Sequence, residues 1–227
     1  MPSAQALRRL HSLSGLVALG AFLLLHLGVN AAAVRGQAAF LSASAWGRLP
    51  LLGVVEIVFV GVPFAFHALY GFWLWQRPRP DLDRFPARTA WVHGAQRISG
   101  LVLAVFVLAH VWELRAQRAL HGLAHDALYS TMMTHLSSTS HGVPLMAVAY
   151  LLGVTAAVFH LSAGLWTYLV AHTPLRGAAA TRAGWACAAF GLLLFVAGAG
   201  TVVSLATGMH VGRADHTAEA PCTPGSR

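Results

Sequence analysis

Charged side chains are scarce in this sequence of 227 residues: they make up 10% of it, against 57% hydrophobic residues. A soluble protein usually carries about 25%, so lipid is the expected solvent. Acidic residues are the rarest, seven against fifteen basic ones, and every basic one is arginine because lysine is absent. A basic excess can indicate nucleic acid, but these arginines lie in short clusters between apolar runs. We therefore expect them to contact lipid headgroups and to bind no nucleic acid.

Cysteine is also nearly absent. The only two, Cys187 and Cys222, lie far apart, and the sequence has no C-x-x-C pair and no C-x-x-C-H. This excludes covalent haem attachment through cysteines and cysteine-ligated iron–sulfur clusters. A glycine-rich nucleotide fingerprint is missing as well. Any prosthetic group must therefore be held by ligation and packing alone.

Five apolar stretches are long enough to cross a bilayer core of about 30 Å, which needs about 20 residues per helix. They cover residues 11–33, 51–75, 97–114, 145–170 and 184–208. We predict an all-α integral membrane domain over residues 1–210, made of a four-helix bundle and a fifth helix. Residues 211–227 are polar and contain proline, which predicts a disordered tail.

The first stretch could be mistaken for an export signal because it follows Arg8 and Arg9. Its apolar run is too long for one, and it carries His26 and Asn30 near its end, so we expect an uncleaved span. With the N-terminus inside, nine of the fifteen arginines are cytoplasmic. The positive-inside rule then predicts a multi-pass protein of the cell inner (cytoplasmic) membrane, with a cytoplasmic N-terminus and an external C-terminus.

A pair of helices occurs twice in the sequence. Residues 13–17 read LSGLV and residues 98–102 read ISGLV, each followed by a histidine further along its apolar run. Residues 66–73 and 159–166 share the pattern F-H-x-x-x-G-x-W. This detail exceeds what apolar composition alone produces. It predicts two helix pairs related by an approximate two-fold axis along the membrane normal.

Each of the first four stretches carries one histidine at membrane depth: His26, His67, His110 and His160. A single such residue is as often a core histidine bonded to a carbonyl, but four at repeat-related positions indicate a shared function. At about 1.5 Å per residue, His26 and His110 lie about 10 and 6 Å below their outer ends. His67 and His160 lie about 12 and 15 Å from their inner ends. We therefore predict an outer pair, His26–His110, and an inner pair, His67–His160.

Each pair can supply both axial ligands of one non-covalent haem b, so that the chain holds two. Bis-imidazole ligation closes both axial positions of the iron, which favours electron transfer over oxygen binding. Gly71 and Gly164 follow the inner histidines by four residues and lie on the same helix face. A missing side chain there leaves room for a flat macrocycle, although close helix packing explains such glycines equally well.

Polar residues near the predicted inner ends of the first and third helices form a second layer. We expect them to bind haem propionates or a quinone, with headgroup anchoring as the alternative. The candidates are Arg9, Ser12, Gln96, Arg97 and Ser99.

Two carboxylates lie in the outer half, Glu56 within the second stretch and Glu113 at the end of the third. A buried carboxylate can carry protons to a bound quinone, so both are candidate proton carriers. The alternative is an interfacial ion pair with an arginine such as Arg48.

These residues together resemble one known family. The segments that carry the likeness are 9–12, 26–30, 56–57, 67–71, 96–100, 110–112 and 159–161. They are similar to the di-haem cytochrome b membrane anchor of succinate:quinone oxidoreductases, which include succinate dehydrogenase and fumarate reductase, in its single-chain, five-helix form. The likeness extends from residue 8 to about residue 208.

The resemblance implies a divided enzyme. His67 and His160 would bind the haem nearer the cytoplasm, and His26 and His110 the haem nearer the outside. A flavoprotein with FAD and an iron–sulfur subunit would dock on the cytoplasmic face, and electrons would reach a quinone, with menaquinone favoured. This chain would have no succinate site of its own, and both succinate oxidation and fumarate reduction are compatible with it.

Three other readings compete with this one. The cytochrome b of a quinol:cytochrome c oxidoreductase carries two histidines on each of two helices, whereas here each helix has one. The di-haem subunit of a formate dehydrogenase, hydrogenase or nitrate reductase is a further quinone-linked alternative. A small transporter or haem-free anchor with histidines as proton relays is the non-redox reading.

Overall fold

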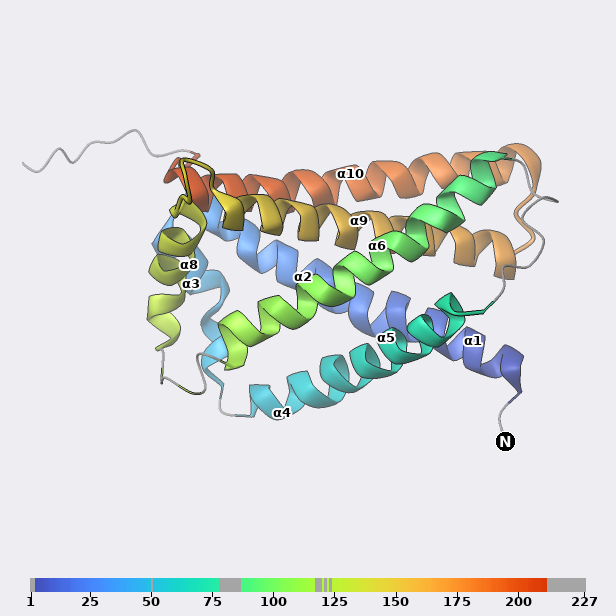
Figure 1. Ribbon diagram of the computed structural model, residues 1–227, viewed down its shortest axis with the longest axis horizontal. Coiled ribbons are helices and arrows are strands. Elements are labelled where there is room, and N and C mark those ends of the chain that lie inside the picture. Colours follow the sequence, from blue (N-terminus) through green and yellow to red (C-terminus); the bar gives the residue numbers. More distant parts are fainter. Residues whose placement is uncertain are drawn as a thin grey trace, which may run out of the picture.

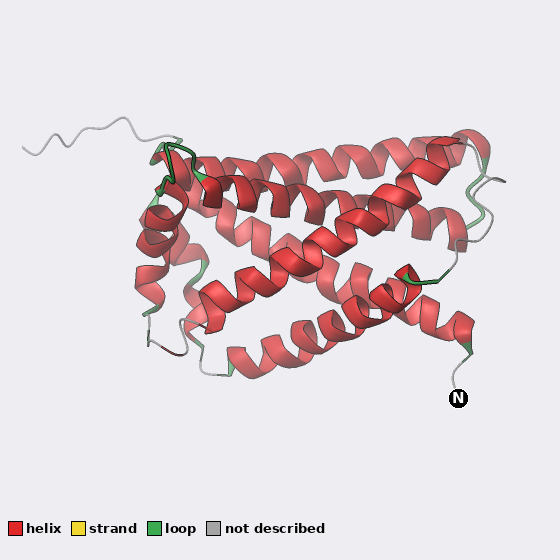
Figure 2. Cartoon of the chain, viewed as in Figure 1, coloured by secondary structure: helices red, strands yellow, loops and turns green. Residues whose placement is uncertain are grey.

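The computed structural model describes residues 3–49, 51–77, 87–116, 120, 122 and 124–211, and within these ranges the chain is helical with no strand (Figure 2). Five helices among the described residues are long and apolar enough to cross a membrane, which confirms the predicted architecture. They run from Ala4 to Arg35, Leu52 to Trp75, Trp91 to Arg115, Leu145 to His172 and Gly177 to Thr207. The predicted tail lies outside the described residues, apart from Val211.

The first span consists of four continuous pieces. They are α1 (Ala4–Leu13), the π-helical turn η1 (Ser14–Leu19), α2 (Gly20–Ala31) and the 3-10 turn η2 (Ala32–Arg35). The helix begins seven residues before the predicted residue 11 because Ser3 caps it: the Ala6 amide donates to Ser3 Oγ at 3.2 Å. Hydropathy marks where a helix enters the bilayer core, and this helix continues beyond that boundary.

The second and third spans also contain π-helical turns. The second comprises α4 (Leu52–Glu56), η4 (Ile57–Gly61) and α5 (Val62–Trp75). The third comprises α6 (Ala87–Val111) and η6 (Trp112–Ala116). Its helix starts ten residues before the predicted residue 97, because it too continues beyond the apolar run.

The last two spans are uninterrupted α-helices, α9 (Leu145–His172) and α10 (Gly177–Thr207). They run side by side along the bundle, α6 crosses α9, and α10 also contacts α2 (Figure 1). The approach of α10 to α9 is close because glycines face it: a Cβ on Gly198 would lie 2.7 Å from Val154, and one on Gly191 would lie 2.9 Å from Ser162. Small residues allow such contacts between membrane helices.

Short helices form a cap over the end of the bundle opposite the N-terminus (Figure 1). The cap consists of α3 (Gln37–Ala43), η3 (Ala45–Arg48), η7 (His125–Ala127) and α8 (Leu128–Ser137). The sequence predicted no membrane span between residues 114 and 145, and α8 was not expected because it is short and lacks a bilayer-length apolar run.

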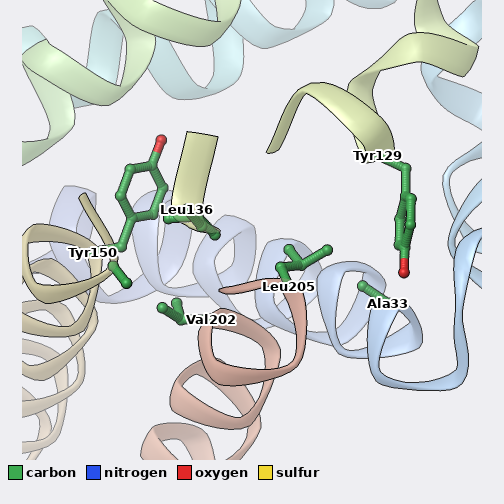
Figure 3. Close-up of a cluster of buried hydrophobic side chains, with 7 residues drawn as sticks. Ala33, Tyr129, Leu136, Tyr150, Val202 and Leu205 are labelled. Atoms are coloured by element: carbon green, nitrogen blue, oxygen red, sulfur yellow. The ribbon is translucent and has the colours of Figure 1, made fainter. Parts of the chain in front are cut away.

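A cluster of buried apolar side chains joins this cap to the bundle (Figure 3). Leu136 of α8 is 1% exposed and packs with residues of η2, α9 and α10. The cluster comprises Ala33, Tyr129, Leu136, Ala147, Tyr150, Val202 and Leu205. A buried apolar cluster therefore lies at the end of the bundle that holds the outer histidine pair.

Candidate functional site

The structure brings the four histidines together as the two predicted pairs. The His67 and His160 rings have centroids 6.1 Å apart and planes inclined by 88°. The His26 and His110 rings are 5.8 Å apart and inclined by 85°. An imidazole nitrogen binds a metal ion at about 2 Å, so two rings on opposite sides of one ion have centroids about 6 Å apart. Both pairs have the spacing of axial ligands, while ligation itself stays a prediction.

Both inner histidines are oriented by backbone carbonyls. His67 Nδ1 lies 2.9 Å from the His11 carbonyl oxygen, and His160 Nδ1 lies 3.0 Å from the Gln96 carbonyl oxygen. A carbonyl only accepts, so Nδ1 carries the proton in both rings. The lone pair of each Nε2 is therefore available to a metal.

A serine and a glycine complete this arrangement at repeat-related positions. Ser14 Oγ donates to the His11 carbonyl at 2.9 Å, and Ser99 Oγ donates to the Gln96 carbonyl at 2.9 Å. One residue further on, Gly15 and Gly100 lie directly beneath the inner histidine rings. A Cβ on Gly15 would be 2.8 Å from His67 Nδ1, and one on Gly100 would be 2.9 Å from His160 Cε1. In each helix the repeated S-G dipeptide therefore lies against one inner imidazole ring. We call the position of Gly15 beneath His67, and of Gly100 beneath His160, the seat of that ring.

The outer pair is held by side chains instead. Tyr150 Oη donates to Glu113 Oε2 at 3.1 Å and lies 3.2 Å from His110 Nδ1. A phenol has one hydrogen, so His110 Nδ1 must donate to Tyr150, which again leaves Nε2 free. Phe22 and Phe106 stack on the outer rings from four residues earlier, at centroid distances of 5.4 Å to His26 and 5.6 Å to His110.

The π-helical turn η1 reconciles an unequal spacing in the repeat. His26 follows Gly15 by 11 residues, whereas His110 follows Gly100 by 10. A π turn accommodates an additional residue because its hydrogen bonds span five residues instead of four. The first span contains such a turn between the two positions, and the third is α-helical there. His26 is thereby turned toward His110.

The predicted polar layer lies near the inner pair, with different roles for its members. Gln96 and Ser99 hold His160 through the contacts given above. The Arg97 guanidinium donates to the Trp75 carbonyl at the end of α5. Ser12 Oγ donates to the Arg8 carbonyl at 3.2 Å, within its own helix. Arg9 is exposed. A propionate role for Arg9, Ser12 and Arg97 stays a prediction.

His11 and Ser14 lie at the site but were not among the predicted site residues. The His11 ring stacks on His67 with centroids 4.1 Å apart and planes inclined by 6°. The signal for both was available in the repeat, since His11 corresponds to Gln96 and Ser14 to Ser99.

The glycines Gly71 and Gly164 face these repeat-related side chains. A Cβ on Gly71 would lie 3.1 Å from His11 Nε2, and one on Gly164 would lie 3.2 Å from Gln96 Nε2. The space beside them is taken by protein, which favours close packing over room for a macrocycle.

Both candidate proton carriers contact basic side chains at the cap end. Glu56 Oε2 lies 2.5 Å from Arg115, and Glu113 Oε1 contacts His135 Nδ1 of α8. The suggested partner Arg48 instead pairs with Asp126 at 2.5 Å. The Arg48 hydrogen bond and charge lower the pKa of that exposed carboxyl below its ordinary value.

Comparison with known proteins decides the family. The chain is 35% identical over 164 residues to the succinate dehydrogenase cytochrome b558 subunit of Bacillus subtilis strain 168, covering 72% of this chain and 77% of that protein. This chain belongs to the family of succinate dehydrogenase cytochrome b subunits. No family model matches the chain, and no solved structure matches it.

The residues of this cytochrome b subunit fit haem b. Imidazoles face each other at ligand spacing, three of the four rings donate Nδ1 to an acceptor, and the glycines beneath the inner rings admit no Cβ. A cysteine-free site of this kind suits a non-covalent haem. The chain is thus a membrane-anchoring cytochrome b of a succinate:quinone oxidoreductase.

Proposed function

We propose that this chain holds two non-covalent b haems and connects the iron–sulfur subunit of its complex to a membrane quinone, with menaquinone favoured. When bound, each haem would supply a one-electron Fe(III)/Fe(II) couple. The observation that carries the proposal is the presence of two facing histidine pairs at two depths in the bundle. His67 and His160 would ligate the inner haem, and His26 and His110 the outer one.

The chain's own residues contribute rigid ligand geometry. The carbonyls of His11 and Gln96 fix the inner imidazoles, and the seats at Gly15 and Gly100 limit their rotation. Ligands held in place in both oxidation states need little reorganisation, which suits electron transfer. Five polar residues around the inner pair are the candidates for propionate binding or for the quinone side: Arg9, Ser12, Gln96, Arg97 and Ser99.

Proton transfer to a quinone is assigned to the carboxylates near the outer pair. Glu56 and Glu113 both lie at the cap end, and each contacts a basic partner that can exchange protons or stabilise its charge. A quinone that takes its protons from these carboxylates would bind near the outer haem, whereas one served by the inner polar residues would bind near the inner haem.

The topology follows from the same proposal. The N-terminus would be cytoplasmic and the C-terminus external, in the cell inner membrane. The FAD flavoprotein and the iron–sulfur subunit would dock on the cytoplasmic face, nearer the inner pair. This chain would contribute the haems and the anchor, and its partners the succinate site.

A reduced-minus-oxidised absorption spectrum of the purified complex, with extracted haem quantified, tests the proposal. Succinate is added first and dithionite afterwards. We expect two haems b per chain, at least one reduced by succinate. A complex with both His110→Ala and His160→Ala should contain no haem, whereas His172→Gln, on the same helix as His160, should retain both. Absence of haem in the unmodified complex would contradict the proposal.

A second candidate, the di-haem subunit of another quinone-linked dehydrogenase or reductase, makes a different prediction. It would also contain two haems, but only dithionite would reduce them. Reduction by succinate therefore separates the two functions.

A further inference from the structure

A continuous chain of side chains leads from the outer histidine pair to the cap. His110 Nδ1 lies 3.2 Å from Tyr150 Oη, Tyr150 Oη donates to Glu113 Oε2 at 3.1 Å, and Glu113 Oε1 contacts His135 Nδ1. These four residues come from α6, α9, η6 and α8. No sequence motif contains them, and Tyr150 was not among the predicted site residues.

The direction of the hydrogen bonds follows from donor counting. An ionised carboxylate only accepts, so the single Tyr150 hydrogen goes to Glu113. His110 must then donate its Nδ1 proton to Tyr150. The negative charge of Glu113 is thereby relayed to the ligand through one neutral hydroxyl.

Burial makes this relay effective. Tyr150 is 8% exposed and belongs to the apolar cluster that joins cap and bundle, while its hydroxyl points away from Val202 and Leu205 (Figure 3). A hydrogen bond in such surroundings is electrostatically stronger than one in water, and linked bonds polarise one another. The packed ring also keeps the hydroxyl at one position.

The inner pair has a different electrostatic environment. His67 and His160 donate to backbone carbonyls, which carry no net charge. The side-chain relay to a carboxylate is a feature of the outer pair, through His110.

We propose that Tyr150 and Glu113 are positioning residues that orient His110 and lower the reduction potential of the outer haem relative to what a neutral acceptor would give. The inference rests on the two-haem function proposed above. An acceptor chain that ends in a carboxylate draws the Nδ1 proton and increases electron donation from Nε2 to iron, which stabilises the ferric state. His135 holds the carboxylate in place from the cap.

Redox titration of the two haems in the intact complex, together with low-temperature EPR of their low-spin ferric signals, tests this role. In Tyr150→Phe we expect one midpoint potential to rise and one EPR signal to change, while the other haem keeps both values. Haem content should stay at two per chain. Tyr129→Phe is the matched control, because it removes a hydroxyl from the same cluster without touching His110, and it should shift neither haem.

Glu113→Gln provides a second variant that leaves the Tyr150 ring in place. We expect the same haem to shift in the same direction by less than in Tyr150→Phe, because an amide oxygen still accepts the phenol hydrogen but carries no charge. If Tyr150→Phe loses haem while Glu113→Gln leaves both potentials unchanged, the Tyr150 hydroxyl has only a structural role and the inference is overturned. Unchanged potentials in both variants, or equal movement of both haems, overturn it as well. An unmodified complex without two haems would instead contradict the function on which the inference rests.

Discussion

The two histidine pairs have nearly the same ligand geometry but are held by different means. The inner rings donate to backbone carbonyls of the helix they face and lie over glycines, in an arrangement that occurs twice with the same spacing. The outer pair depends on a phenol, a carboxylate and a cap helix for His110, and on a π-helical turn for His26.

Two kinds of hydrogen-bond acceptor, backbone and side-chain, therefore orient the same type of histidine pair. A backbone acceptor needs no particular side chain, so a short repeated S-G dipeptide can specify it. Side-chain acceptors require several elements to meet, but they bring charge close to the ligand. The inner pair is therefore sensitive to small changes in volume, and the outer pair to changes in charge.

The largest expected effect comes from removing a single ligand. We expect His67→Ala to lower haem content from two to about one per chain and to spare the outer haem, because the outer ligands do not depend on it. His26→Ala should give the converse result. Pyridine haemochrome quantification with EPR identifies which haem remains. Loss of both haems in either variant would show that the pairs are not independent.

The second-largest effect is expected from adding a methyl group beneath an inner histidine ring. Gly100→Ala forces His160 to move, and overpacking of this kind costs about 1–3 kcal/mol, so we expect inner haem to be lost on mild detergent treatment. Gly94→Ala is the matched control on the same helix, since nothing lies within 4 Å of a Cβ there. Haem retention after detergent exposure is the measurement. Equal retention in the two variants would contradict the proposed seat.

Quinone turnover should depend on the cap end. Glu56→Gln removes a candidate proton carrier, and loss of a positioned acid–base group costs about a hundredfold in rate. We expect succinate:quinone turnover to fall by about that factor, while haem content and haem reduction by succinate persist. Asp126→Asn, an exposed carboxylate of the cap, should leave turnover unchanged. Normal turnover in Glu56→Gln would remove Glu56 from the quinone chemistry.

The smallest effect is expected at the surface ion pair Arg48–Asp126. The lowered pKa of Asp126 means that its ionised form is favoured in the folded state. Its stabilising contribution is complete above the ordinary carboxyl pKa of 3.8 and declines as the pH falls through the lower folded-state value. We expect Asp126→Asn to lower the melting temperature slightly at pH 7 and by less at pH 3. High salt should reduce the difference, and a difference that grows at low pH would contradict this account.

Sequence reasoning predicted the five spans and both histidine pairings, because bilayer thickness and helical rise convert residue number into depth. It missed how far the helices extend beyond the apolar core, as at Ala4, and it missed the cap helix α8. Hydropathy has no signal for a helix that lies outside the bilayer. Ser14 could have been found from its counterpart Ser99, whereas nothing in the sequence singles out Tyr150.

The sequence alone determined the membrane architecture and the four histidines, since apolar length and depth are properties of each helix by itself. Only the tertiary structure decided which nitrogen of each of three rings is free, which carboxylate pairs with which base, and that Glu113 reaches His110 through Tyr150. Those features depend on where separate helices meet to within a hydrogen-bond length. The π turn at Ser14–Leu19 accommodates one additional residue. It therefore changes which residues of neighbouring helices face each other, without changing the hydropathy of the span.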